Sequence, residues 1–142
     1  MGQAEARGAL LLKDSPSPAI TRMPHILYAE DHRVVAHVVK ETLEEQGWRV
    51  VLCYDGAVAV KRLASEAKYD LLLFDNHLPN VSGLDLVRYA RQFSHRKGIP
   101  IIMLSADYCE REARLAGVNE FLMKPRDVGR IVETVARLLG TS

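Results

Sequence analysis

The sequence has no long apolar run and no excess of charge of either sign. Its 142 residues carry 19 lysines and arginines against 18 aspartates and glutamates, a formal net charge of +1. Such a balance lacks the strong overall field that draws a chain to nucleic acid or to a membrane surface. The early apolar run at 9–12 is too short for a signal peptide, and no stretch reaches the roughly 20 apolar residues of a membrane span. We therefore expect a cytoplasmic protein without direct nucleic-acid or membrane contacts.

Cysteine and glycine motifs are equally sparse. The two cysteines, Cys53 and Cys109, have no metal-ligand spacing, and each lies in an apolar or helical stretch. We interpret both as reduced structural thiols. No Walker-type glycine run is present, which argues against a P-loop phosphate site.

A hydrophobic content of 48% with 26% charged residues fits one compact domain with its own core. Residues 1–22 mix small, charged and proline residues without periodicity, which predicts a flexible leader followed by a domain at 23–142. Met23 precedes the first apolar run. The leader therefore has three explanations that the sequence leaves open: an upstream misassigned start, a tag remnant or a native tail.

After Met23, short apolar runs alternate with helical patterns, which is typical of an α/β fold on a parallel sheet. Strands are expected at 25–29, 49–54, 70–74, 100–104 and 120–123. Helices are expected from about 35 to a stop at Gly47, and then at 57–67, 84–93, 108–116 and 128–139. Two of the strands are continuously apolar, as expected where helices cover both faces of the sheet. We predict a flavodoxin-like, doubly wound (βα)5 fold with strand order 2-1-3-4-5 and no output domain after the last helix.

Polar side chains follow four of the predicted strands at their carboxyl ends. Glu30 and Asp31 follow the first strand, Asp75 the third, Ser105 the fourth and Lys124 the fifth. In open parallel sheets, ligands bind outside these strand ends, where the strand order reverses. For the order 2-1-3-4-5 this point lies between strands one and three, so the acid pair and Asp75 should face one another.

Three carboxylates in one shallow cleft raise one another's pKa unless a cation lies among them. Hard oxygen ligands with open positions suit Mg²⁺, which often bridges to phosphate. Such a site favours phosphoryl transfer to Asp75, with Lys124 and Ser105 holding the remaining phosphoryl oxygens.

Four motifs carry a resemblance to a known family: Tyr28-Ala29-Glu30-Asp31, Phe74-Asp75-Asn76-His77-Leu78-Pro79 with Gly83 further on, Leu104-Ser105-Ala106, and Met123-Lys124-Pro125. From Met23 onward, the chain resembles the receiver domain of two-component response regulators, including single-domain forms such as the chemotaxis regulator. The resemblance implies that Asp75 is the phosphoacceptor and Asp31 a direct Mg²⁺ ligand. It implies further that Glu30 acts at the metal directly or through water, and that the backbone carbonyl of His77 is the third protein ligand.

The same resemblance assigns roles to residues around the acceptor. Ser105 takes the switch hydroxyl position, Phe121 the switch aromatic position and Lys124 the position of the lysine typical of the family. The bond before Pro125 is expected to be cis, a form that an X-Pro bond adopts readily. His77 and Asp107 depart from the commonest pattern, and we hypothesise that they set the rate of phosphoryl loss.

The resemblance also implies partners. The phosphoryl donor would be a sensor histidine kinase or a histidine phosphotransfer protein, and the protein would be a signalling protein and not an enzyme in the ordinary sense. Phosphorylation would change the surface formed by the fourth helix, the fifth strand and the fifth helix, which would then select a downstream protein target. We expect a monomer or a phosphorylation-dependent dimer.

Other interpretations compete with this one. A receiver-like module that binds partners without phosphorylation would keep the fold but lose an acid, the acceptor or the lysine. A haloacid-dehalogenase-type phosphatase needs a second aspartate where this chain has His77, and a flavodoxin-like redox protein needs phosphate loops that are missing. Taken singly, Asp31 suits a helix cap and Lys124 a solvated surface. The basic cluster at 88–97 is interpreted as a solvated face.

Overall fold

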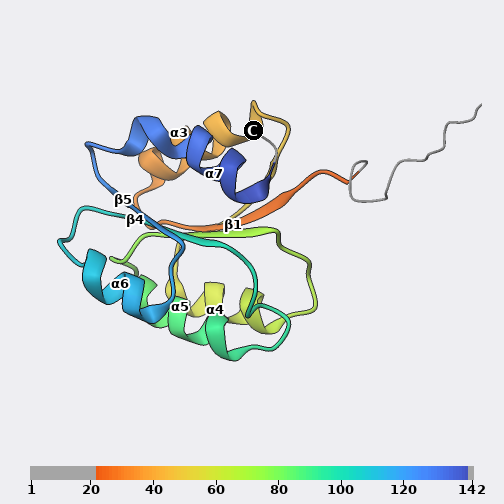
Figure 1. Ribbon diagram of the computed structural model, residues 1–142, viewed down its shortest axis with the longest axis vertical. Coiled ribbons are helices and arrows are strands. Elements are labelled where there is room, and N and C mark those ends of the chain that lie inside the picture. Colours follow the sequence, from red (N-terminus) through yellow and green to blue (C-terminus); the bar gives the residue numbers. More distant parts are fainter. Residues whose placement is uncertain (1–21, 141–142) are drawn as a thin grey trace, which may run out of the picture.

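The computed structural model describes residues 22–140 (Figure 1). All but one residue of the predicted leader therefore lies outside the described part, and the domain boundary at Met23 stays a prediction. The described chain has the predicted alternation of strands and helices.

Five parallel strands form one sheet in the predicted order, β2-β1-β3-β4-β5. They are β1 (His25–Ala29), β2 (Arg49–Cys53), β3 (Leu71–Phe74), β4 (Ile101–Ser105) and β5 (Glu120–Met123). Two strands match the predicted bounds, β2 and β3 differ by one residue at one end, and β4 is shifted by one residue at both ends. The flavodoxin-like fold class is confirmed.

Helices cover both faces of the sheet, as Figure 1 shows. One face carries α3 (Arg33–Glu44) and α7 (Ile131–Leu139), and the other carries α4 (Gly56–Ala64), α5 (Gly83–Gln92) and α6 (Glu110–Ala116). The last helix begins as a short 3₁₀ turn, η1 (Val128–Arg130). The expected stop of the fourth helix at Gly117 is present, because this glycine adopts the left-handed conformation that ends helices.

The central strands are buried on both faces because their side chains alternate between two cores. Leu71 and Leu73 pack with α3 and α7, whereas Leu72 and Phe74 pack with α4, α5 and α6. The continuous apolar sequence of β3 is thereby explained. Both cores hold the carboxyl end of β3 in place, and Asp75 directly follows it.

The basic cluster at 88–97 is only partly the solvated face that the sequence suggested, because Arg88 and Lys97 are exposed but Arg96 is buried. Arg96 is only 2% exposed, and its guanidinium donates hydrogen bonds to the backbone oxygens of Arg62, Leu63 and Ser65 at 2.8–3.2 Å. These carbonyls lie at the end of α4, where a helix leaves acceptors without partners. The guanidinium also lies over the Tyr69 ring, 4.8 Å from its centre. The carbonyls at this helix end thus explain a buried arginine that sequence pattern alone could not place.

Gly83 permits the close approach of α5 to the end of β3. A Cβ atom added at Gly83 would lie 2.1 Å from the backbone oxygen of Asp75 and 2.8 Å from the Cα of Asn76. Such distances cannot be relieved by a side-chain rotation, because the atoms belong to the backbone. The position therefore requires glycine for space.

We predict that Gly83→Ala destabilises the fold by about 2 kcal/mol, in the range of overpacked sites. The measurement is urea denaturation of the variant beside the matched control Gly98→Ala, since no atom lies within 4 Å of a Cβ at Gly98. The control should stay within about 0.5 kcal/mol of the parent protein. Equal effects of the two substitutions would contradict the steric explanation.

Candidate functional site

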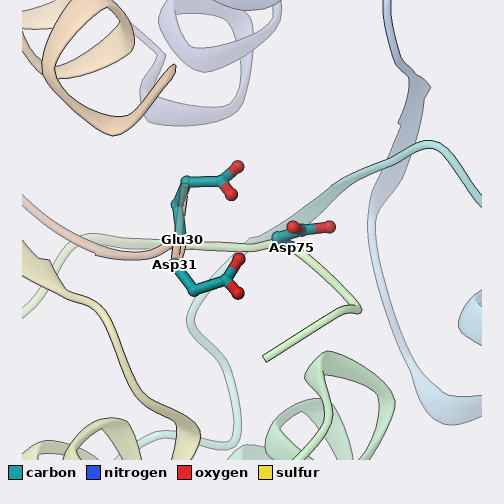
Figure 2. A group of neighbouring side chains, drawn as sticks. All are labelled: Glu30, Asp31 and Asp75. Atoms are coloured by element: carbon teal, nitrogen blue, oxygen red, sulfur yellow. The ribbon is translucent and has the colours of Figure 1, made fainter. Parts of the chain in front are cut away.

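Three carboxylates meet at the carboxyl end of the sheet (Figure 2). Glu30 and Asp31 follow β1 and Asp75 follows β3, and these two strands pair in parallel with Ala29 opposite Phe74. One carboxylate oxygen from each of the three acids lies within 4.8 Å of the others. The predicted meeting of the acid pair with Asp75 is therefore present in the structure.

Burial makes this grouping of negative charge costly. Glu30 is 1% exposed and Asp75 6%, whereas Asp31 is exposed. Burial, followed by the nearby charge of Glu30, raises the pKa of Asp75 to about 6. The charge of Lys124 opposes this shift only in part. The site thus favours additional positive charge, either a proton or a cation.

Lys124 supplies the positive charge that the protein itself brings to the site. Its Nζ lies 2.5 Å from Glu30 Oε1 and 3.4 Å from Asp75 Oδ2. The peptide bond from Lys124 to Pro125 is cis, as expected. The side chain is mostly buried between two carboxylates, so the alternative of a solvated surface lysine is wrong.

The remaining atoms of the acids fit a hard divalent cation. The second carboxylate oxygen of Glu30 accepts a hydrogen bond from the backbone N–H of His32 at 3.1 Å. The helix cap suggested for Asp31 is absent, because His32 caps α3 by accepting from the N–H of Val35. The exposed Asp31 carboxylate is therefore not engaged as a cap. Oxygen donors that leave open positions for water are the set that Mg²⁺ prefers.

The loops after β3 and β4 are joined beside Asp75. His77 Nε2 lies 2.8 Å from Asp107 Oδ1, and the side-chain amide of Asn76 donates to Asp107 Oδ2 at 3.1 Å. Burial acts to raise the pKa of Asp107, but the hydrogen bonds to Asn76 and His77 together outweigh it and bring the pKa below its ordinary value. The sequence singled out His77 and Asp107 separately. Their direct contact, and the part played by Asn76, appear only in the structure.

Ser105 and Phe121 are both buried. The Ser105 hydroxyl accepts a hydrogen bond from the backbone N–H of Asp107 at 3.1 Å, so it is tied to the same loop. Phe121 is 6% exposed and packs in the core formed with α4, α5 and α6. Any inward rotation of this ring would start from a buried position, and its role as a switch stays a prediction.

Tyr28 has no role that its sequence motif suggests, but its hydroxyl lies buried close to the acids. Among the described residues it is the one buried side-chain nitrogen or oxygen atom without a hydrogen-bond partner. Strand alternation, which places residue 28 of β1 on the same face of the sheet as residue 30 just after it, is the signal that could have drawn attention to this hydroxyl.

The family model for the response regulator receiver domain matches residues 26–136. The chain belongs to this family. It is a receiver domain of the kind found in two-component signalling systems. No helix among residues 22–140 is both long enough and apolar enough to cross a membrane.

Relatives of the receiver domain differ greatly in length. Chemotaxis protein CheY1 of Helicobacter pylori is 33% identical over 121 residues, which cover 82% of this chain and 98% of CheY1. The sensory/regulatory protein RpfC of Xanthomonas campestris is 34% identical over 125 residues, which cover 84% of this chain. The match spans only 17% of RpfC, so it concerns one part of a much longer protein.

Solved structures of other receivers are closely similar. The receiver domain of a sensor histidine kinase from Pseudomonas aeruginosa has a TM-score of 0.76 and 30% identity, covering 84% of this chain and 99% of that domain. That structure is described with a magnesium ion coordinated in its active site cleft. The chemotaxis response regulator CheY4 of Vibrio cholerae has a TM-score of 0.75 and 27% identity, covering 82% and 99%.

The raised pKa of Asp75 predicts how the metal-free protein responds to pH. A carboxyl whose pKa is higher in the folded than in the unfolded state stabilises the fold below its unfolded pKa, and that contribution is lost as the pH rises to about 6. Asp75→Asn should therefore raise the melting temperature at pH 8 by roughly 5 °C. At pH 4 the two proteins should melt nearly together.

Thermal melts in chelator at both pH values measure this difference. Addition of Mg²⁺ at pH 8 should then raise the melting temperature of the parent protein more than that of Asp75→Asn. A stabilisation of Asp75→Asn that is the same at pH 4 and pH 8 would contradict the electrostatic cause.

Proposed function

We propose that Asp75 accepts a phosphoryl group from a phosphohistidine, carried by a sensor histidine kinase or a histidine phosphotransfer protein. The observation that carries the proposal is the grouping of Glu30, Asp31 and Asp75, with the Lys124 ammonium 3.4 Å from Asp75 Oδ2. Membership in the receiver family supports the same role. So does RpfC, a sensory/regulatory protein that contains a similar segment.

The reaction forms one bond and breaks one. A carboxylate oxygen of Asp75 attacks phosphorus, the phosphorus–nitrogen bond of the phosphohistidine breaks, and the imidazole leaves with the electron pair. The Lys124 ammonium and the Ser105 hydroxyl contact the phosphoryl oxygens, where negative charge must be stabilised.

Mg²⁺ fits the same site. Asp31, Asp75 and the backbone carbonyl of His77 would hold it, with Glu30 bound directly or through water. When bound, the ion neutralises charge on the phosphoryl oxygens. The fit rests on the oxygen donors and on the raised pKa of Asp75, both of which favour an added cation.

The signal would reach a partner through the surface formed by α6, β5 and α7. Ser105 moves toward the phosphoryl group, which breaks its hydrogen bond with the Asp107 N–H and releases the loop before α6. Phe121 on β5 adjusts with this loop, and the altered surface selects a downstream protein target. We keep the predictions of a cytoplasmic location and of a monomer that can dimerise on phosphorylation.

Phosphorylation is tested with a small donor, acetyl phosphate or phosphoramidate, in the presence of Mg²⁺. Mass spectrometry should show one added phosphoryl group on the parent protein, none in chelator, and none at this site in Asp75→Asn. Lys124→Ala should slow labelling by about tenfold or more, because a charged hydrogen bond at the phosphoryl group is lost. A parent protein that never gains the phosphoryl mass would favour the alternative of a binding module that works without phosphorylation.

The contact between His77 and Asp107 predicts the lifetime of the phosphoryl group. The pair joins two loops beside Asp75, so it narrows the approach of a water molecule to phosphorus. His77→Ala should shorten the lifetime of the phosphoryl group by about threefold, the rate ratio that corresponds to the free energy of a typical exposed side-chain pair. Asp107→Ala should have a similar effect, and the double variant should add little to either single one.

The control for this experiment is Arg88→Ala, which removes a different surface contact, the ion pair between Arg88 and Asp85 on α5. Its phosphoryl lifetime, timed by loss of the added mass, should equal that of the parent protein. Unchanged lifetimes in the His77 and Asp107 variants would end the hypothesis that these residues set the rate.

A further inference from the structure

Tyr28 carries a hydroxyl that packing does not explain. The side chain is fully buried on β1, among apolar residues of the core beneath α3 and α7. An unpaired hydroxyl in such a place destabilises a fold, since it has lost its water and gained no partner. Phenylalanine would fill the same space without this penalty.

The hydroxyl lies close to the charges of the candidate site. Tyr28 is the fourth residue of β1 and Glu30 follows the strand directly, so strand alternation continued by one residue places both side chains on the same face of the sheet. Burial above all, then the charges of Glu30 and Asp75, and last the closeness of the hydroxyl to the Glu30 carboxylate raise the pKa of Tyr28, although the hydroxyl has no partner at hydrogen-bond geometry. The phenol therefore stays protonated and can act only as a neutral hydrogen-bond donor beside these acids.

In the unphosphorylated protein, the hydrogen-bond partners of Glu30 are Lys124 and His32, not Tyr28. Oε1 is 2.5 Å from the Lys124 ammonium and Oε2 accepts from the His32 N–H. Lys124 cannot keep this position unchanged if a phosphoryl group is placed on Asp75, because the new oxygens carry more negative charge than the carboxylate did. Oε1 of Glu30, which is almost fully buried, would then lose the ammonium that pairs with it, while Oε2 keeps the His32 N–H. A buried carboxylate oxygen that loses a charged partner is costly even where Mg²⁺ offsets part of the negative charge.

We propose that Tyr28 is a positioning residue whose hydroxyl donates a hydrogen bond to Glu30 once Lys124 turns to a phosphoryl group on Asp75. One new hydrogen bond would give a partner both to the phenol, which has none now, and to the Glu30 oxygen from which Lys124 has moved away. The unphosphorylated state carries the cost of the unpaired hydroxyl, so the bond favours the phosphorylated state. This inference rests on the proposed function of Asp75.

Tyr28→Phe tests the inference, with beryllofluoride and Mg²⁺ taking the place of the phosphoryl group. The variant without ligand should melt at the same temperature as the parent protein or higher, because only an unpaired hydroxyl is removed. Its affinity for beryllofluoride, measured calorimetrically at saturating Mg²⁺, should fall about tenfold, as expected for one hydrogen bond to a charged group. Its affinity for Mg²⁺ alone should not change.

The matched control is Tyr69→Phe, because Tyr69 is also buried but packs in the core on the other face of the sheet. This control should bind beryllofluoride as the parent protein does. A general loss of packing would instead weaken both variants alike.

A spectroscopic readout separates positioning from packing. In protein labelled with ¹³C at tyrosine Cζ, beryllofluoride should move one of the five tyrosine resonances toward the phenolate position, as a phenol does when it begins to donate to a carboxylate. That resonance is absent from Tyr28→Phe. If this variant does not fold, phenylalanine at each of the other four tyrosines assigns the resonance by elimination.

The outcomes for Tyr28 and for Asp75 are distinguishable. If the parent protein and Asp75→Asn bind beryllofluoride equally, or neither binds it, the proposed function fails, and this inference with it. If the parent protein binds beryllofluoride and Asp75→Asn does not, the proposed function stands. The role of Tyr28 is then overturned if Tyr28→Phe keeps full affinity or if the Tyr28 resonance stays in place.

Discussion

The contact of Lys124 with the buried carboxylates of Glu30 and Asp75 is the interaction on which the site depends. Two acids this close together and this far from water repel each other, and one ammonium offsets their charge only in part. Burial first, and this imbalance of charge second, raise the pKa of Asp75. A site left short of positive charge attracts a cation, and the carboxylate that a cation neutralises can approach an anionic phosphoryl group.

The sheet and its two cores hold these acids close together in spite of their repulsion. Parallel pairing of β1 with β3 places the acids that follow them side by side, and two apolar cores hold these strands from both faces. The absence of a side chain at Gly83 lets α5 begin against the backbone of Asp75. The position of each acid is therefore set by backbone geometry and packing, and the energy of the cores exceeds the repulsion that the site introduces.

Most of the fold could be predicted, because apolar runs that end in polar residues mark strands whatever the rest of the chain does. Strand ends were off by at most one residue, since the last hydrogen bond of a ladder depends on the neighbouring strand. Arg96 was misjudged for a related reason. Its partners are carbonyls more than thirty residues away at the end of α4, and no local pattern shows which helix end a distant arginine will contact.

By itself, the sequence determined the order of strands and helices and the presence of acids, a hydroxyl and a lysine at successive strand ends. These features follow from local periodicity and from the rule that parallel strands end at one edge. Only the tertiary structure decided which atoms meet. It showed that His32 and not Asp31 caps α3, that His77 contacts Asp107, and that the Tyr28 hydroxyl is buried without a partner. Such contacts depend on side-chain directions and on distances across the sheet, which residue spacing along the chain does not specify.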